Sequence, residues 1–232
     1  MTLVGREIGV VSVESGVTAQ TGAGLVAKRV IDVVLSLIIL AVTAPLCGLA
    51  AVAIRLESRG PALFKQDRVG RGGTVFTMFK FRSMRQDADP AVHREHIREL
   101  MAAAAEDDGG PPRSFKVVDD ARLTRVGRFI RAFSIDELPQ LVNVIRGEMS
   151  LIGPRPEIPY ALENYLSHHH RRFAVLPGLS GLWQVSGRDE ISPRDMLELD
   201  VQYAEHWSMR TDLSLMARTV PVVFGISSRR GS

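Results

Sequence analysis

Two adjacent carboxylates, Asp136 and Glu137, are the first candidates for chemistry, and they lie in the segment SIDELPQL at 134–141. An ionised carboxylate can act as a nucleophile on phosphorus, and a carboxylate beside it can hold Mg²⁺. A helix that begins here would place Asp136 at its positive end, which favours the ionised form. The structural alternative is a capping box between Ser134 and Glu137. Pro139 weakens that alternative, because with Ser134 as N-cap it would remove a helical hydrogen bond.

Three cations are candidates for binding phosphate. Arg155 lies between two prolines in the stretch GPRP at 153–156, and the prolines restrict the backbone on both sides of it. A guanidinium placed in this way can bind a phosphate with two parallel hydrogen bonds. Lys80 and Arg82 would point to one face of a strand, where paired cations suit a diphosphate. The structural alternatives are a turn with an exposed arginine and a solvated strand face.

A basic run of three histidines and two arginines covers residues 168–172. Neighbouring histidines on a helix point in different directions, so the run predicts no metal site. We expect it to lie at the surface or against membrane headgroups. The sequence contains no G-x-x-x-x-G-K loop, no Gly-rich dinucleotide fingerprint, no G-x-S-x-G elbow and no H-E-x-x-H pair.

An apolar run is the most prominent of the elements that must position these residues. The 22 residues from 33 to 54 carry no formal charge, and a bilayer core needs roughly 20 apolar residues in a helix. The hydrophobic region of a signal peptide is shorter and starts nearer the N-terminus. A buried helix of a soluble protein is rarely apolar on all sides over such a length. The run therefore predicts insertion into a membrane.

Two features of this run argue against a simple transmembrane span. Pro45 lies in its middle, where it removes a backbone hydrogen bond and kinks or breaks the helix. Both flanks are basic, with Lys28 and Arg29 before the run and Arg55 and Arg59 after it. The positive-inside rule would place both flanks on the cytoplasmic side. A re-entrant helix broken at Pro45 satisfies both observations, whereas the alternative is an ordinary Pro-kinked transmembrane helix.

The rest of the chain predicts an α+β, mostly helical fold. A β-hairpin is expected over 60–84, where polar and apolar residues alternate on both sides of a Gly-rich turn. The apolar C-terminal stretch is too short to span a bilayer and suits the membrane interface. We expect three regions: a flexible tail (1–24), the membrane helix (25–58) and a catalytic domain (59–232) with a variable insertion at 85–118. The expected helices are 121–131, 137–146, 157–172, 192–207 and 213–226.

The composition excludes several classes of protein. The chain has 232 residues, 45% of them hydrophobic and 24% charged, which is typical of a folded protein. Its single cysteine excludes a disulfide scaffold and a Cys-rich zinc module. The 29 basic residues are scattered among 26 acidic ones, with a net charge of +3. That pattern argues against nucleic-acid binding, which favours a dense basic stripe.

Taken in order, these segments resemble the bacterial sugar transferase family, the monotopic phosphoglycosyl transferases, over about residues 25–226. The resemblance rests on KRVIDVVLSL, Pro45, LFKQDRVGRGG, KFRSM, TRVGRFIRAFSIDELPQLVNVIRGEMSLIGPRP, PGLSGLWQVSGR and LDVQYAEHWSMRTDLSL. The block from SIDELPQL to GPRP is its most specific part.

The resemblance implies transfer of a sugar phosphate from a UDP-sugar to polyprenyl (undecaprenyl) phosphate, with release of UMP, at the start of polysaccharide assembly. It implies a ping-pong mechanism with a covalent phosphosugar on Asp136, Mg²⁺ at the Asp136–Glu137 dyad and phosphate binding by Arg155. Further anion contacts would come from Lys80, Arg82 and Arg128.

The resemblance also implies a location at the cytoplasmic face of the bacterial inner membrane, in contact with its lipids. The family anchor is re-entrant and broken near a Ser-Pro dipeptide, but this chain has Ala44-Pro45, so the serine hydroxyl is absent. The resemblance implies the short form of the family, without an additional transmembrane bundle. A polytopic phosphoglycosyl transferase would need more apolar runs. The non-enzymatic alternative is a membrane-tethered basic module that binds lipid or nucleic acid.

Overall fold

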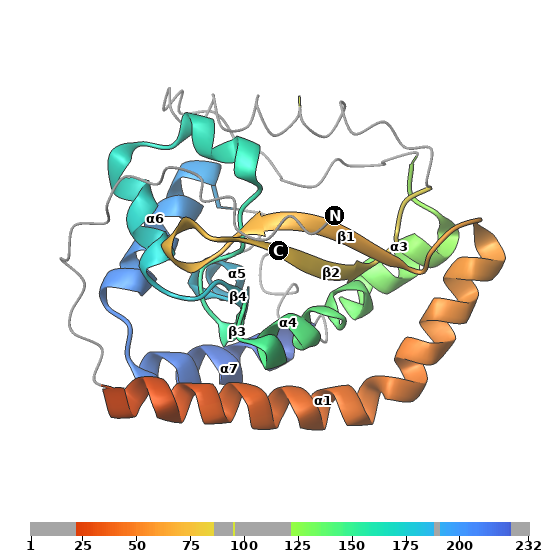
Figure 1. Ribbon diagram of the computed structural model, residues 1–232, viewed down its shortest axis with the longest axis horizontal. Coiled ribbons are helices and arrows are strands. Elements are labelled where there is room, and N and C mark those ends of the chain that lie inside the picture. The colour runs from red at the N-terminus through yellow and green to blue at the C-terminus, as the bar shows by residue number, and fades with distance from the viewer. Residues whose placement is uncertain (1–21, 86–94, 96–121, 188–190, 224–232) are drawn as a thin grey trace, which may run out of the picture.

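The computed structural model describes residues 22–85, 95, 122–187 and 191–223 (Figure 1). Residues 1–21 of the expected tail lie outside the described residues, and so does the expected insertion apart from Arg85 and Glu95. Met84 and Leu123 form an antiparallel bridge, and the Arg85 amide donates to the Arg122 carbonyl. The two residues that flank 86–121, Arg85 and Arg122, therefore lie next to each other.

The long helix α1 (Gly22–Glu57) contains the apolar run. It is 36 residues long and continuous, with Pro45 inside it, so the expected break at Pro45 is wrong. Proline removes only one amide donor, and the helix continues past it with a bend. Figure 1 shows the helix running along one side of the molecule and then turning sharply in its second half. It is the one helix in the described part of the chain with the length and apolar composition to enter a membrane.

The N-terminal part of α1 is attached to the body of the protein by polar contacts. Lys28 forms an ion pair of 2.5 Å with Asp212, which is fully buried. Arg29 donates to the last carbonyls of another helix, those of Val144 and Ile145, at 2.5 and 2.7 Å. The basic residues on this flank therefore bind the protein itself.

The C-terminal end of α1 is attached to the same body. The Glu57 carboxylate accepts hydrogen bonds of 2.7 and 2.8 Å from the first two amides of α3 (Arg125–Ala132). Such a contact satisfies free amides at a helix start. Near this end, Ala50 and Ile54 pack in a buried cluster with Phe81, Ile130 and Ile135.

The expected hairpin is confirmed. Strands β1 (Leu63–Val69) and β2 (Val75–Phe81) pair antiparallel, with Leu63 opposite Phe81 and Val69 opposite Val75. The turn needs glycine, because Gly72 has a φ of 66° in the left-handed region. Met78 of β2 packs in a second buried cluster with Leu141, Val144, Met149 and Leu151.

The segment that follows α3 carries the two carboxylates. It contains the 3₁₀ helix η2 (Ile135–Glu137) and then α4 (Gln140–Arg146). The helices expected over 121–131 and 137–146 are therefore present as the shorter α3 and α4. Gly127 of α3 lies so close to residue 83 that a Cβ there would meet the Ser83 carbonyl oxygen at 1.9 Å. This close approach seats α3, and the turn after it, against the end of β2.

A second, parallel sheet was not expected. It joins β3 (Ser150–Ile152) to β4 (Gly178–Ser180). The helix expected over 157–172 is wrong: the chain forms two 3₁₀ helices, η3 (Pro159–Asn164) and η4 (Ser167–Ala174). The two are separated by extended residues at Tyr165 and Leu166.

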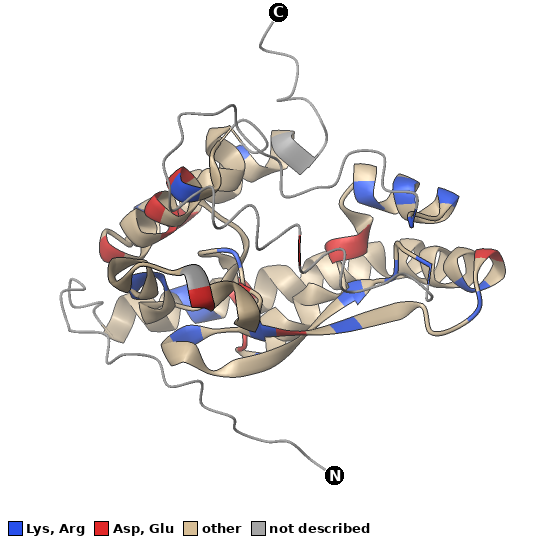
Figure 2. Cartoon of the chain, turned by 90° about the horizontal axis from the view of Figure 1, so that it is seen from above, with Lys and Arg blue, Asp and Glu red and all other residues tan. Residues whose placement is uncertain are grey.

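The C-terminal region is helical. It comprises α5 (Leu182–Ser186), α6 (Pro193–Glu205) and α7 (Met209–Val223). The expected helix over 192–207 is confirmed, with Ser192 as N-cap accepting from the Asp195 amide. Figure 2 shows basic and acidic residues interspersed over the described chain rather than gathered in one stripe. The fold is mostly helical with small sheets, as expected.

Candidate active site

Asp136 lies in η2 and is only 2% exposed. Ser134 before it adopts a left-handed conformation, with φ 55° and ψ 19°, and its side chain makes no capping hydrogen bond. A left-handed serine is uncommon and marks a conformation that the surroundings impose. The capping-box interpretation is therefore wrong, because it needs a hydrogen bond from the Ser134 side chain.

Lys80 of β2 brings a positive charge to both carboxylates. Its Nζ lies 2.8 Å from Asp136 Oδ2 and 3.6 Å from Glu137 Oε1. On the other side of the dyad, Arg155 Nη2 lies 3.9 Å from the same Glu137 oxygen. The structure thus gathers Lys80, Asp136, Glu137 and Arg155 from three separate parts of the chain.

The charge on Asp136 is set by opposing effects. Burial raises the pKa of Asp136, and the neighbouring Glu137 raises it further. Lys80 lowers it, as does Arg131 at the end of α3. The sequence suggested that a helix end would favour the ionised form, but η2 has only three residues. Lys80 is instead the main group that stabilises the ionised carboxylate.

Asn143 of α4 fixes the dyad relative to the strand that carries Lys80. Its side-chain oxygen accepts from the Phe79 amide at 3.1 Å, and its nitrogen donates to the Thr77 carbonyl at 2.8 Å. The amide thereby binds the free edge of β2 in the way that another strand would. Asn143 also donates to Glu148 at 2.7 Å and is fully buried.

The loop that carries Arg155 is bound through its backbone. The Gly153 amide donates to Ser180 at 2.9 Å, and the Gly178 amide donates to Pro154 at 2.7 Å. A Cβ at Gly153 would meet the Leu176 carbonyl oxygen at 2.4 Å, so only glycine fits. These contacts link the loop to the parallel sheet.

The Arg155 side chain is 45% exposed and lies 6.0 Å from the centre of the Trp183 ring. Arg68 of β1 donates to the Pro156 carbonyl at 3.1 Å, and its Nε is buried without a hydrogen-bond partner in the described part of the protein. Burial lowers the pKa of Arg68 to about 10, and the like charge of Arg155 adds to this shift. Two neighbouring guanidiniums give this side of the dyad a positive potential that suits an anion.

Two predicted anion ligands, Arg82 and Arg128, make no hydrogen bond or ion pair with this group in the described part of the chain. Arg82 instead binds the turn after α1, where its Nη1 donates to the Arg59 carbonyl at 2.6 Å and its Nη2 to the Ser58 carbonyl at 2.8 Å. Arg128 lies on the exposed face of α3. Arg82 was predicted from strand alternation, but the strand ends at Phe81.

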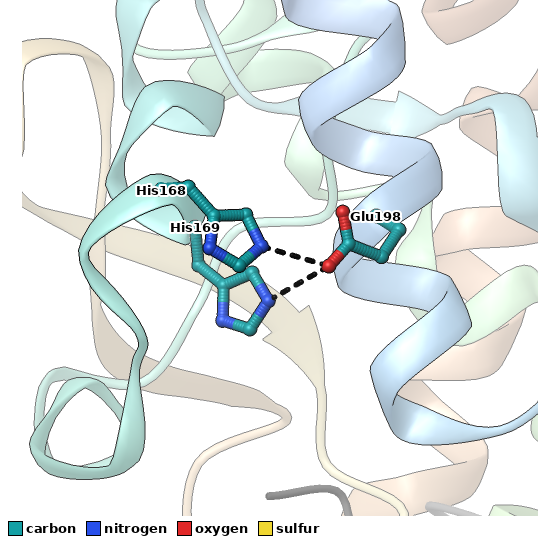
Figure 3. Close-up of side chains that lie close together, drawn as sticks. All are labelled: His168, His169 and Glu198. Carbon is teal, nitrogen blue, oxygen red and sulfur yellow. Dashed lines mark hydrogen bonds and ion pairs between the residues drawn. The ribbon is translucent and has the colours of Figure 1, made fainter.

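The basic run at 168–172 lies in η4 and faces α6. Figure 3 shows the imidazoles of His168 and His169 pointing to one carboxylate oxygen of Glu198, at 2.8 and 3.3 Å. The expectation that neighbouring histidines diverge is therefore wrong, and so is the headgroup role for His169, which is 4% exposed. In η4 both rings tilt toward α6.

The three donor atoms at this cluster lie within 4.8 Å of one another, which is close enough for a metal ion. Their hydrogen bonds give a different account. The Leu166 amide donates to His169 Nδ1 at 3.3 Å, so in the neutral ring Nε2 carries the proton and donates to Glu198. A metal at Nε2 would have to displace that proton and break the Leu166 contact. The cluster is best described as a bridge between η4 and α6.

Sequence reasoning missed three supports of this site: Asn143, Arg68 and Arg172, whose Nη2 donates to the Arg155 carbonyl at 2.6 Å. Arg68 belongs to the hairpin motif LFKQDRVGRGG, and Arg172 ends the basic run, but neither pattern indicates a partner. The assembled site contains a buried carboxylate with a lysine partner, a second, partly exposed carboxylate and an exposed arginine. This set can bind an anion and place an oxygen nucleophile beside it.

Comparison with known proteins identifies what the chain resembles. Residues 23–226 match the profile of the family described as bacterial sugar transferase. The chain is 42% identical over 203 residues to the galactosyl transferase CpsE of Streptococcus agalactiae, with 86% of this chain and 42% of the relative covered. It is 43% identical over 203 residues to the UDP-glucose:undecaprenyl-phosphate glucose-1-phosphate transferase of Caulobacter vibrioides, with 84% and 68% covered. It is 37% identical over 208 residues to the exopolysaccharide production protein ExoY of Sinorhizobium fredii, with 88% and 90% covered. The chain thus spans less than half the length of the Streptococcus relative and most of the Sinorhizobium one.

Proposed function

The chain belongs to the bacterial sugar transferase family, and from that premise we propose that it transfers a sugar 1-phosphate from a UDP-sugar to undecaprenyl phosphate. The names of relatives support both substrates, because one is named a UDP-glucose:undecaprenyl-phosphate transferase and others undecaprenyl-phosphate sugar phosphotransferases. UMP is the leaving group, and the product starts the assembly of an exopolysaccharide or related glycan.

The observation that carries this proposal is the ion pair between Lys80 and the buried Asp136, 2.8 Å long, beside Arg155. A carboxylate oxygen of Asp136 attacks the phosphorus that bears the sugar. The bond from that phosphorus to the UMP oxygen breaks, and UMP leaves with the electron pair. The phosphosugar is then held by Asp136 as an acyl phosphate.

The second half of the reaction regenerates the site. A phosphate oxygen of undecaprenyl phosphate attacks the same phosphorus, and the bond between this phosphorus and the Asp136 oxygen breaks. The free carboxylate returns to its contact with Lys80, and the polyprenyl diphosphosugar leaves in the membrane. This ping-pong order lets a soluble and a lipid substrate use one site in turn.

Glu137 is the residue we propose for Mg²⁺, with Asp136 beside it. The carboxylate oxygens are the hard ligands that Mg²⁺ prefers, and Glu137 Oε1 lies 3.6 Å from Lys80 and 3.9 Å from Arg155, in the group of charges around Asp136. The metal would supply positive charge to the diphosphate. Arg155 would bind a phosphate oxygen, and Lys80 would keep the Asp136 carboxylate ionised and oriented.

We propose that α1 is re-entrant and that the catalytic domain lies on the cytoplasmic face of the inner membrane. Both ends of the helix bind the same body, through Lys28 at one end and Glu57 at the other. Both ends must then lie on one side of any membrane that the helix enters. Between them, apolar side chains are exposed, including Val42 (74%) and Leu49 (70%).

The helix α3 supports this arrangement. Phe129 and Phe133 lie one turn apart on its exposed side, with ring centres 4.9 Å from each other. Arg128 is exposed on the same helix. Exposed aromatic rings next to arginine suit the headgroup layer of a membrane. We propose that α3 lies in this layer beside the end of α1.

Labelling of cysteines tests the topology. We expect Ala23→Cys and Arg59→Cys, each in a Cys47→Ser background, to react with a membrane-impermeant maleimide from the cytoplasmic side in inverted vesicles and not in intact spheroplasts. Val42→Cys, in the apolar middle of α1, is the matched control and should stay unlabelled in both. Labelling of positions 23 and 59 from opposite sides would rule out the re-entrant arrangement.

Release of UMP tests the activity itself. In detergent, with Mg²⁺ and undecaprenyl phosphate, we expect the protein to release UMP from one member of a panel of UDP-sugars and to form a lipid-linked phosphosugar. A protein that binds undecaprenyl phosphate vesicles but releases UMP from no member of the panel would instead be a non-enzymatic lipid-binding module.

A further inference from the structure

The facing sides of η4 and α6 are joined by charged and polar pairs. The basic run of η4 supplies one partner of each pair, and acidic residues of α6 supply the other. The pairs are His168 and His169 with Glu198, Arg171 with Glu205, and Arg172 with Asp200. Only the Arg172–Asp200 pair is completely buried, with both side chains 2% exposed.

Arg172 reaches from this pair to the loop that carries Arg155. Its Nη2 donates to the Arg155 carbonyl at 2.6 Å as well as to Asp200 Oδ2. Its Nη1 donates to Glu157 Oε2 at 3.2 Å and to the Tyr165 hydroxyl, which itself donates to Glu157 at 2.9 Å. The guanidinium therefore binds the loop at the carbonyl of Arg155 and at the side chain two residues further on.

These contacts act on the backbone of Arg155, whereas its side chain points away to the dyad. The flanking prolines already restrict the backbone, and Arg68 binds the next carbonyl, that of Pro156, at 3.1 Å. With its carbonyl fixed by Arg172, the Cα of Arg155 has little freedom to move. The 3.9 Å separation between its guanidinium and Glu137 then depends on the buried ion pair behind the loop.

We propose that Arg172, held in place by Asp200, is a positioning residue that fixes Arg155 for binding the diphosphate of the donor substrate. This inference rests on the proposed function, because it assigns Arg155 to the UDP-sugar. The acid that fixes Arg172 comes from α6, so the helix takes part in substrate binding without touching the substrate. A buried ion pair stabilises a fold weakly, but it can specify one geometry.

A double-mutant cycle separates positioning from general stability. Arg172→Lys keeps the positive charge next to Asp200, but an ammonium cannot reproduce the planar contacts of a guanidinium. We expect Arg172→Lys to weaken UDP binding, measured by calorimetry, and to lower kcat/KM for the UDP-sugar, each about tenfold. In an Arg155→Gln background, Arg172→Lys should have almost no further effect on UDP binding or kcat/KM, because the arginine that Arg172 positions is already absent.

Arg171→Lys is the matched control and should bind UDP like the wild type. Arg171 also pairs with an acid of α6, but within the described residues it makes no hydrogen bond or ion pair with the loop. Where Arg172→Lys is misfolded by circular dichroism, Asp200→Asn is measured in the same cycle with the same expectation. The proposal would be overturned if the losses caused by Arg172→Lys and Arg155→Gln multiplied in the double variant. It would also be overturned if a folded Arg172→Lys protein bound UDP as tightly as the wild type. Coupled UDP binding in a protein that releases no UMP would keep the positioning role and reject the transferase activity.

Discussion

Replacing Asp136 by asparagine is expected to abolish the reaction, with UMP release reduced by about 10³-fold or more, the scale of loss when a catalytic nucleophile is removed. The amide has nearly the same shape as the carboxylate but cannot form the acyl phosphate. The ion pair with Lys80 is lost at the same time, while Glu137 stays 3.6 Å from the lysine and offers it another partner. The measurement is the rate of UMP release from the preferred UDP-sugar with undecaprenyl phosphate and Mg²⁺ present.

Asp67→Asn is the matched control for this experiment. Asp67 is an exposed carboxylate of β1 that accepts a hydrogen bond from Thr77 at 3.2 Å, and the same substitution there should leave the rate unchanged. If Asp136→Asn turned over at the wild-type rate, Asp136 could not be the nucleophile, even if the fold and the family assignment stood.

Lys80→Met is expected to have the next largest effect, with a loss of roughly 10²-fold at pH 7, because the buried Asp136 carboxylate without its cationic partner takes up a proton more readily. The ionised form of Asp136 is the reactive one, so activity falls as the pH decreases through the Asp136 pKa. Burial raises that pKa and Lys80 lowers it. Removing Lys80 therefore moves the acidic limb of the kcat/KM profile to higher pH, and activity recovers in part as the pH increases.

Two further variants make the pH profile decisive. Lys80→Arg keeps a positive charge near Asp136 and should leave the acidic limb close to its wild-type position. Lys65→Met removes an exposed lysine from the other strand of the hairpin and should change neither rate nor profile. An unshifted limb in a folded Lys80→Met protein would mean that Lys80 does not control the charge of Asp136.

Local patterns predicted the elements that depend on neighbouring residues. The hairpin over 63–81 follows from alternation and from the glycines of its turn, and α6 follows from Ser192 and Pro193 at its start. The helix expected over 157–172 failed because long-range contacts decide this segment. Tyr165 lies in extended backbone between η3 and η4, and its hydroxyl contacts Glu157 and the buried Arg172. The hydrophobic periodicity of a segment does not indicate such long-range contacts.

The candidate site was predicted to a similar extent. Asp136, Glu137, Arg155 and Lys80 were predicted from residue type and resemblance, and the structure brings them together. Arg82 carries the same charge as Lys80 and lies two residues away, yet it binds the turn after α1. Arg82 and its partner Arg59 are 23 residues apart in the chain. The sequence around Arg82 therefore does not indicate that the end of β2 lies beside the end of α1. A motif specifies residue types, whereas the packing of the fold decides which partner each side chain contacts.

Few elements connect α1 to the candidate site. Glu57 at the end of α1 caps α3, and α3 leads through the left-handed Ser134 to Asp136. Asp32, near the other end of α1, accepts a hydrogen bond of 3.0 Å from the Leu151 amide of β3, two residues before the loop that carries Arg155. Both halves of the site are therefore attached to α1, which fits the proposed reaction between a soluble donor and a lipid acceptor.

Trapping of the covalent intermediate tests the central claim most directly. The protein is incubated with Mg²⁺ and its preferred UDP-sugar in the absence of polyprenyl phosphate, and its intact mass is measured. The account predicts about one UMP released per protein, a mass increase of one sugar phosphate on the peptide that contains Asp136, and loss of this adduct when undecaprenyl phosphate is added. UMP release that occurs only when undecaprenyl phosphate is present, with no adduct at any time, would contradict it.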